Sequence, residues 1–401
     1  MGRAGPEVAD IFRKYGASFN CKNSLSYEQL RTLRAVAICR TADLGGHIDR
    51  CSHCGHEVIS YNSCRNRHCP KCQSLAKASW LDARKAELLN VDYFHLVFTL
   101  PKVLNQIALQ NKKEVYNILF KAASKTLLTI AGDSKHLGVQ TGFMAVLHTW
   151  GQTLLHHPHL HCIIPGGGLS QDEREWIRSR RKFFLPVRVL SRLFRRLFLE
   201  HLIRSFHQNR LAFYGDLHRL SDPADFSKLI EKCSRHEWVV YAKSPFSGAE
   251  KVLDYLSRYT YRTGISNNRI VKVEKGAVSF SWRNYRNENR SQIMTLKSHE
   301  FIRRFLMHVL PSGFVRIRYF GFLCNRYRKE KLRHCRKLLQ QPDPIECEDM
   351  DWKTRHLALT GKDIDCCPRC GQGRLVIYQK LLPLYSILSR PPPYMNLVSG
   401  Q

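Results

Sequence analysis

Three histidines in two adjacent apolar segments have the spacing of a metal site. His159 and His161 lie two residues apart in HHPHLHCII, which predicts a strand. Side chains two residues apart point to the same face of a strand, so both imidazoles share a face while the alternate residues point toward the core. His148, in the preceding predicted strand, is the predicted third ligand, with Gln152 and His157 as alternatives. A hydrated Mg²⁺ or Mn²⁺ ion at such a site keeps positions open for a phosphate oxygen.

Two tyrosines are candidate nucleophiles. Tyr255 and Tyr259 lie four residues apart in DYLSRYTYRTG, whose helical pattern gives them a shared face that excludes Tyr261. A tyrosine that attacks a phosphodiester conserves the bond energy as phosphotyrosine, so the strand can be rejoined without a cofactor. Arg258 and Arg262 beside them are predicted to contact DNA. Without the histidines, a pair of core or interface aromatics is the better interpretation.

Two CxxC pairs predict a structural zinc site. The four cysteines are Cys51, Cys54, Cys69 and Cys72. Fourteen residues separate the two pairs, and two such knuckles can supply four thiolates to one tetrahedral Zn²⁺. A set of four cysteines needs no open coordination position, so the predicted role of the ion is structural.

The segment SCRNRHCPKC around the second pair carries further candidate ligands and cations. Cys64 and His68 are alternative zinc ligands, which leaves a second ion or an exchanged ligand open. Arg65, Arg67 and Lys71 place positive charge beside the metal and are candidates for DNA phosphate contacts. A solvated basic face is the simpler alternative for these three residues.

A second cysteine cluster lies near the other end of the chain. CCPRCG supplies one knuckle from Cys366, Cys367 and Cys370, and no obvious second knuckle accompanies it. The candidates that could complete it are Cys335, Cys347, His334 and His356. A zinc site and unliganded cysteines are equally compatible with this pattern.

The elements that position these residues follow from apolar periodicity. We expect helices within residues 1–45, 73–89, 192–206 and 249–259, a helical hairpin or bent helix over 103–130, and strands at 93–100, 141–150, 157–164 and 238–242. The strands at 141–150 and 157–164 are predicted neighbours in one antiparallel sheet, with Gly166 to Gly168 ending the second. The mixed order of elements predicts the α+β class.

The charge points to a polyanion as partner. Lysine and arginine number 64 against 33 acidic residues, a net charge of +31 that is spread along the chain. Such an excess favours nucleic acid binding. No stretch approaches the roughly 18 apolar residues of a membrane-spanning helix, and the first residues lack the apolar core of a signal peptide. We therefore expect a cytoplasmic protein with reduced thiols and no membrane partner.

The motifs resemble a known superfamily. FTLP at 98–101, HPHLH at 157–161 and YLSRY at 255–259 occur in the order found in HUH endonucleases, which include rolling-circle initiators, relaxases and transposases. YNSCRNRHCPKCQ, HTWGQ, PGGGLS and GFVRIRYFGFLCNRYR resemble the insertion-sequence-ninety-one family of two-tyrosine transposases. The resemblance covers most of the chain.

The resemblance implies roles for individual residues. His159 and His161 would be the motif histidines that hold Mg²⁺ or Mn²⁺, Tyr255 and Tyr259 the nucleophiles, and His148 the third ligand by similarity to an upstream histidine of relaxases. The expected organisation is a helical and zinc-binding domain at 1–90, an HUH catalytic domain with the tyrosine helix across an antiparallel sheet at 91–310, and a basic region at 311–401 with a possible second zinc knuckle.

The implied activity is metal-dependent nicking and transfer of single-stranded DNA at insertion-sequence ends. The reaction would pass through 5′-phosphotyrosine intermediates by a rolling-circle-like route, in a protein associated with the bacterial nucleoid. One alternative is a plasmid replication initiator or relaxase with the same chemistry. The other is a non-catalytic, zinc-containing DNA-binding regulator.

Overall fold

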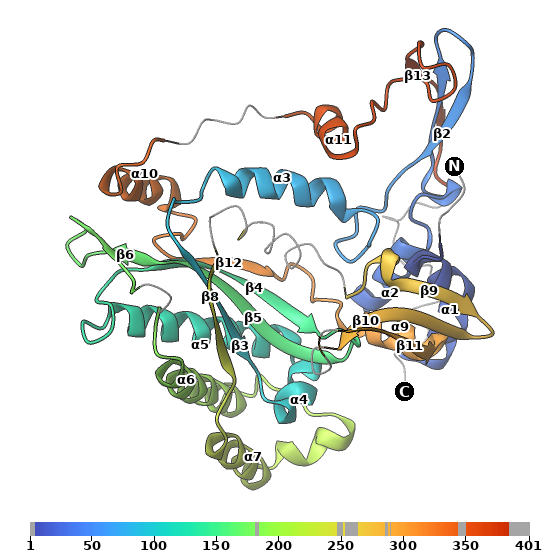
Figure 1. The fold of residues 1–401 in the computed structure, drawn as a ribbon. Coiled ribbons are helices and arrows are strands. Elements are labelled where there is room, and N and C mark those ends of the chain that lie inside the picture. Colours follow the sequence, from blue (N-terminus) through green and yellow to red (C-terminus); the bar gives the residue numbers. More distant parts are fainter. Residues whose placement is uncertain are drawn as a thin grey trace.

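Helices pack on antiparallel sheets in the structure (Figure 1). The computed structural model describes residues 5–180, 184–246, 252, 264–284, 288, 290–343 and 350–384. The predicted α+β class is confirmed, because antiparallel sheets and long helices alternate irregularly along the chain. Within the described residues, no helix combines the length and the apolar character needed to cross a bilayer.

A five-stranded antiparallel sheet lies at the centre of the fold. Its strands, in spatial order, are β12 (Ile317–Gly321), β4 (Gly142–Trp150), β5 (His156–Pro165), β3 (Tyr93–Thr99) and β8 (Val240–Phe246). The predicted strands at 93–100, 141–150 and 157–164 are confirmed to within one residue at each end. Glycine is required at Gly167, two residues after the end of β5. Its φ is +150°, and an added Cβ there would lie 2.4 Å from the Ile177 carbonyl oxygen.

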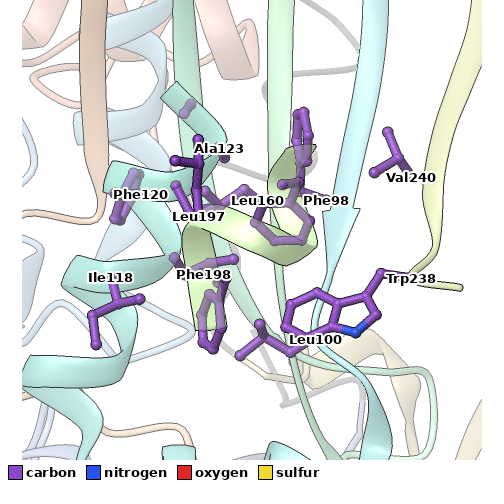
Figure 2. Close-up of a cluster of buried hydrophobic side chains, with 14 of the residues drawn as sticks. Phe98, Leu100, Ile118, Phe120, Ala123, Leu160, Leu197, Phe198, Trp238 and Val240 are labelled. Carbon is purple, nitrogen blue, oxygen red and sulfur yellow. The ribbon is translucent and has the colours of Figure 1, made fainter. Parts of the chain in front are cut away.

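The main hydrophobic core fills one side of this sheet. Helices α5 (Lys112–Gly132) and α6 (Val187–His207) cover that side (Figure 1). Figure 2 shows Phe98 and Leu160 of the strands against Phe198 and neighbouring side chains of the two helices. Burial of this apolar surface contributes about 25 cal/mol per Å² to the stability of the fold. It stabilises the packing of the sheet on the helices and fixes which strand residues face inward.

The opposite face of the sheet carries a smaller apolar cluster. Met144 and Ile163 are buried there together with Val252. Helix α3 (Gln73–Lys85) lies over this face and packs Trp80 against the cluster (Figure 1). The helix confirms the one predicted over 73–89.

A helical bundle and a second sheet adjoin the turn between the end of β4 and the start of β5. They consist of α1 (Val8–Lys22), α2 (Tyr27–Ala37), α9 (Ser298–Met307), β9 (Ile270–Glu274), β10 (Ala277–Asn284) and β11 (Arg290–Lys297). Ser26 starts α2 with a capping box, in which its hydroxyl accepts from the Gln29 N–H and the Gln29 side chain accepts from the Ser26 N–H. Phe12 of α1 packs edge-on against Phe305 of α9, with ring centroids 5.2 Å apart.

A third sheet brings together residues from the two ends of the described chain. Its order is β13 (Leu375–Leu381), β1 (Gly46–Cys51) and β2 (Glu57–Tyr61), and it projects from the body of the molecule (Figure 1). The remaining elements are α4 (Asn105–Gln110), α7 (Pro223–Arg235), α10 (Arg328–Leu338), α11 (Trp352–Thr360), the β6 (Gly167–Leu169) and β7 (Trp176–Arg178) hairpin, and the 3-10 turns η1 (Ala42–Leu44), η2 (Lys102–Leu104), η3 (Gly215–Ser221) and η4 (Asn267–Arg269).

Contacts cross both of the predicted domain boundaries, at residues 90 and 310. Strand β12 completes the central sheet beside β4, and β13 pairs with β1. Helix α9, from the predicted catalytic segment, packs on α1. The division into 1–90, 91–310 and 311–401 stays a prediction, and any such units share elements in three dimensions.

Two adjacent leucines of α5 test the assignment of the core. Leu127 is fully buried in the main core, whereas Leu128 is 36% exposed. Leu127→Ala is expected to lower the free energy of unfolding by about 2–5 kcal/mol because it leaves a cavity, and Leu128→Ala by about 0.5 kcal/mol. Denaturant unfolding followed by circular dichroism measures both. Equal losses in the two variants would contradict this packing.

Candidate active site

The central sheet brings the three predicted histidines together on one face. His148 of β4 is the direct register partner of His159 of β5, and His161 follows two residues later on β5. Their ligand nitrogens all lie within 4.8 Å of one another. The alternate residues of β5, Leu160 and Cys162, are fully buried in the main core as predicted.

The nitrogen geometry fits a metal ion. The Nε2 atoms of His159 and His161 lie 3.0 Å apart, which is about the separation of two ligands at right angles, each about 2.1 Å from an ion. His159 Nδ1 donates to the His157 carbonyl oxygen over 2.6 Å, so Nε2 of the neutral ring keeps its lone pair. Burial lowers the pKa of His159 to about 4, and burial together with His148 lowers the pKa of His161 well below its ordinary value. Both rings are therefore neutral at pH 7, the form that binds metal.

A fourth histidine, absent from the sequence-based site, supports this group. His95 of β3 is 2% exposed, and its Nε2 lies 2.8 Å from Nδ1 of His161. The two rings stack with an interplanar angle of 7°. Contact at Nδ1 fixes the orientation of His161 and leaves its Nε2 directed toward His159. The available signal in the sequence was a histidine inside the apolar strand YFHLVFTL.

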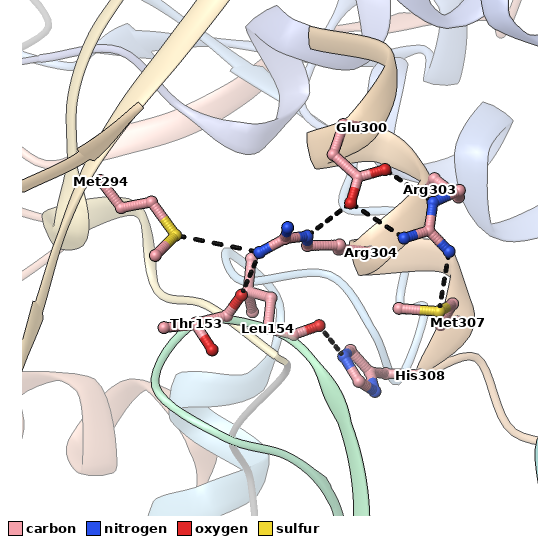
Figure 3. Close-up of polar contacts among 8 residues, drawn as sticks. All are labelled: Thr153, Leu154, Met294, Glu300, Arg303, Arg304, Met307 and His308. Atoms are coloured by element: carbon pink, nitrogen blue, oxygen red, sulfur yellow. Dashed lines mark hydrogen bonds and ion pairs between the residues drawn. The ribbon is translucent and has the colours of Figure 1, made fainter. Parts of the chain in front are cut away.

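The turn between β4 and β5 is held by the adjoining bundle (Figure 3). Arg304 of α9 donates to the Thr153 carbonyl oxygen over 3.0 Å, and His308 Nε2 donates to the Leu154 carbonyl oxygen over 3.0 Å. Arg269 donates to the Gln152 carbonyl oxygen over 2.6 Å. Because three carbonyl groups of the turn are bound, the register that places His148 opposite His159 is fixed at its closed end.

A groove of about 850 Å³ opens over the histidines. Beyond the three imidazoles it is lined by Trp150 at the end of β4 and by Arg269, Trp282 and Arg283 of the β9–β11 region. The Trp150 ring stacks on His148, with centroids 4.8 Å apart. Aromatic rings and cations beside a candidate metal site suit a nucleic acid strand, whose bases stack and whose phosphates carry charge. Gln152 and His157 also line the groove but lie outside the three-histidine group.

The predicted nucleophiles Tyr255 and Tyr259 lie outside the described residues, as do Arg258 and Arg262. Val252, three residues before Tyr255 in the sequence, is described and is fully buried on the histidine face of the central sheet. It packs in the cluster that contains Val146, and Val146 is the register partner of His161. Val252 is therefore buried on the sheet face that carries the histidines.

Eight cysteines form two groups of four. One consists of Cys39, Cys64, Cys69 and Cys72, and the other of Cys51, Cys54, Cys367 and Cys370. Within each group the sulfur atoms all lie within 4.8 Å of one another. This arrangement corrects the predicted single set, because the pair Cys51 and Cys54 lies in a different group from the pair Cys69 and Cys72. The fold separates them, since the first pair ends β1 while the second precedes α3.

Comparison with known proteins agrees with this architecture. A family model described as a putative transposase matches residues 142–331, and one described as a transposase zinc-binding domain matches residues 11–100. The chain is 55% identical over 380 residues to a putative transposase, y4qJ, of Sinorhizobium fredii. The aligned residues make up 94% of this chain and 96% of that protein. The chain belongs to the insertion-sequence-ninety-one family of transposases.

A more distant relative covers most of the same length. The transposase for insertion sequence element IS801 of Pseudomonas savastanoi pv. phaseolicola is 27% identical over 346 residues, which is 86% of this chain and 82% of that protein. The matched transposase model includes all three histidines of the site, and the zinc-binding model includes the group of Cys39, Cys64, Cys69 and Cys72.

The zinc-binding domain of the transposase uses one cysteine that no motif indicated. Cys39 is fully buried, and its sulfur lies 3.4 Å from that of Cys72. Cys64, an alternative ligand in the sequence, belongs to the same group, with its sulfur 3.6 Å from Cys72. His68 lies outside the group. Its Nε2 accepts from the Leu310 N–H, and burial lowers the pKa of His68 to about 3.

Three of the four residues proposed to complete the second knuckle of the transposase lie elsewhere. Cys335 is fully buried in an apolar cluster, and His334 contacts the Glu173 carbonyl oxygen. His356 is half-buried and contacts Thr360 and the Lys362 carbonyl. Cys347 lies outside the described residues. Cys366 lies beside the group but does not belong to it. Cys367 and Cys370 group with Cys51 and Cys54, which corrects Cys335, His334 and His356 as the residues that complete the knuckle.

Two of the three candidate DNA contacts beside the zinc-binding cysteines have partners inside the transposase. Arg67 donates twice to the Phe314 carbonyl oxygen over 3.0 Å. Lys71 forms an ion pair of 2.5 Å with Glu7. Arg65 is exposed, with φ +49°. These contacts favour structural roles for Arg67 and Lys71, and leave Arg65 as the exposed candidate for a phosphate contact.

His308, which donates to the turn beside the site, makes the stability of the transposase depend on pH. Burial lowers the pKa of His308 to about 4 from its ordinary value of 6.5. As the pH falls from 6.5 toward 4, the unfolded chain takes up a proton there that the folded chain does not, so the free energy of unfolding falls. His308→Gln should reduce this slope by up to about 1.4 kcal/mol per pH unit.

Denaturant unfolding at several pH values in this window measures the slope. The same substitution at His136, which is exposed, is the matched control and should leave the slope at the wild-type value. A slope unchanged in the His308 variant would show that this ring does not enter the folded state neutral.

Proposed function

We propose that this transposase nicks and transfers single-stranded DNA at insertion-sequence ends, with His148, His159 and His161 holding a divalent ion and Tyr255 and Tyr259 as nucleophiles. The observation that carries the proposal is the group of three imidazoles on one sheet face, which line the groove of about 850 Å³. Carboxylate suits Mn²⁺ better than imidazole does. A site of three imidazoles nevertheless leaves positions on the ion open for water and a phosphate oxygen.

The position of Val252 supports the assignment of the tyrosines. Its side chain is fully buried on the histidine face. Tyr255 and Tyr259 follow it by three and seven residues, and in the helix that the sequence predicts these positions share one face. A helix that buries Val252 on the sheet would thus direct both phenols toward the face that carries the histidines.

The reaction can be written on the side chains of this site. A tyrosine phenol loses its proton, and its oxygen forms a bond to the scissile phosphorus. The bond from phosphorus to the 3′ oxygen breaks, and that oxygen takes up a proton to become a free 3′-hydroxyl. The product is a 5′-phosphotyrosine, which a 3′-hydroxyl later attacks to restore a phosphodiester and release the phenol. A divalent ion, when bound, would polarise the scissile phosphate.

Three further residues of the groove would hold the strand. Trp150 and Trp282 present aromatic rings on which bases can stack, and Arg283 is exposed at the same groove. Tyr319, another aromatic residue of the sheet, accepts from Arg84 on the part of the sheet that α3 covers. The net charge of +31 favours a DNA partner, in keeping with a protein at the nucleoid.

The covalent intermediate provides the test. Purified protein is incubated with a labelled single strand that spans an element end and its flanking sequence, with Mn²⁺ or with EDTA. We expect a metal-dependent protein–DNA adduct that peptide mass spectrometry maps to Tyr255 or Tyr259. The double variant Y255F/Y259F should lose the adduct at least about 100-fold while it keeps DNA binding, because only the nucleophilic oxygen is removed.

Tyr261 supplies the matched control. It lies in the same segment but off the predicted face, so Y261F should form the adduct at the wild-type rate. Tight binding to element ends with no adduct would favour the DNA-binding regulator. An adduct formed on plasmid origin sequences but not on element ends would favour the replication initiator or relaxase.

A further inference from the structure

We propose that Cys51, Cys54, Cys367 and Cys370 bind a second structural Zn²⁺, which joins the two ends of the described chain into one zinc ribbon. This site is independent of the catalytic proposal. The model for the transposase zinc-binding domain ends at residue 100, so it contains only half of these ligands.

The sulfur positions match tetrahedral thiolate coordination. Cys51 Sγ lies 3.7 Å from Cys370 Sγ, and Cys54 Sγ lies 3.7 Å from Cys367 Sγ. Four sulfurs each about 2.3 Å from a zinc ion lie about 3.8 Å apart in a tetrahedron. A disulfide needs about 2.05 Å, so the thiols are placed for a shared ion rather than for bonds to one another.

The backbone around both cysteine pairs has the form of a zinc knuckle. Each pair reads CxxCG, and the glycines that follow, Gly55 and Gly371, have φ +69° and +67°. The Cys54 N–H donates to Cys51 Sγ over 3.4 Å, and the Gly373 N–H donates to Cys370 Sγ over 3.4 Å. Such N–H contacts stabilise thiolate charge, the form of cysteine that binds metal.

The two knuckles are fixed against each other by strand pairing. Cys51 is the register partner of Leu375, at the point where β1 meets β13. Beyond it, the Ser52 N–H donates to the Arg374 carbonyl oxygen over 2.9 Å. A Cβ atom added at Gly373 would lie 2.3 Å from Cys51 Sγ. Only glycine therefore lets the second knuckle approach the first closely enough to share an ion.

The third sheet has little else to hold it together. Among the described residues of β1, β2 and β13, Cys51 alone is buried. Large apolar side chains of the same strands face solvent, with Ile59 54% and Ile377 62% exposed. A small sheet without an apolar core requires another source of stability, and a structural zinc ion supplies it.

Zinc content of the full-length protein provides the test. Counting the two cysteine groups, wild-type protein should contain two Zn²⁺ per chain, measured by inductively coupled plasma mass spectrometry. C51S and C367S should each contain one. The double variant C51S/C367S should also contain one, because both residues serve the same ion. Cys366 lies next to Cys367 but outside the group, so C366S is the matched control and should keep two.

The double variant separates the alternatives. If each end of the chain bound its own ion, C51S/C367S would lose one more ion than either single variant, and the proposal would be overturned. Retention of two ions by C367S would overturn it as well. C367H should restore the second ion, because imidazole can replace a thiolate as ligand.

Alkylation of the wild-type protein gives a result that does not depend on variants that fold. Cys21 and Cys54 are both exposed, so exposure alone predicts that iodoacetamide labels both. We expect Cys21 to react at once, and Cys54 to react together with Cys51, Cys367 and Cys370 only after a chelator removes zinc. Labelling of Cys54 at the rate of Cys21 before chelation would contradict a bound ion at this site.

Discussion

The candidate active site depends on the register between β4 and β5. His148 stands directly opposite His159, and a slip of one residue would turn one of the two rings to the other face of the sheet. Two features prevent the slip. Leu147 and Leu160, which are register partners, are buried in the main core, and the turn between the strands is bound by side chains of α9 and of the region before β9. The packing of the opposite face and the contacts from the adjoining bundle thus set the position of the imidazoles.

Different physical forces stabilise the central sheet and the β1–β2–β13 sheet. The central sheet is stabilised by the burial of apolar side chains against α5 and α6. The β1–β2–β13 sheet exposes most of its apolar side chains and buries sulfur at one end. Helix α11, which precedes β13 along the chain, is joined to the body of the molecule by an ion pair between Arg355 and Asp82 of α3, 3.3 Å apart. In the small β1–β2–β13 sheet, a bound metal ion would provide the stability that a hydrophobic core provides in larger sheets.

Local pattern was sufficient to predict β3, β4 and β5 and the grouping of the three histidines. Alternation of apolar residues defines β3, β4 and β5, and period two places His159 and His161 on one face. The same pattern could not locate His95, because its contact with His161 arises from pairing between strands 66 residues apart. The roles of Tyr255 and Tyr259 stay predictions, since both lie outside the described residues.

The cysteines show most clearly where the sequence was insufficient. Spacing identifies a CxxC pair as a knuckle but carries no information about its partner, which the fold alone decides. Adjacent pairs were assigned to each other, whereas Cys51 lies with Cys370, 319 residues away. Cys39 had no neighbouring cysteine to mark it as a ligand, and it reaches Cys72 only because the chain after α2 turns back past the start of α3.

Pulsed electron paramagnetic resonance of bound Mn²⁺ tests the central claim most directly, because imidazole nitrogens couple to the electron spin of the ion. We predict nitrogen coupling in wild-type protein, and its reduction or loss in His148→Asn, His159→Asn and His161→Asn. His157→Asn is the matched control, since this residue lines the same groove outside the group, and it should keep the wild-type signal. Bound Mn²⁺ without nitrogen coupling, or a signal unchanged in all three variants, would contradict a metal site formed by these histidines.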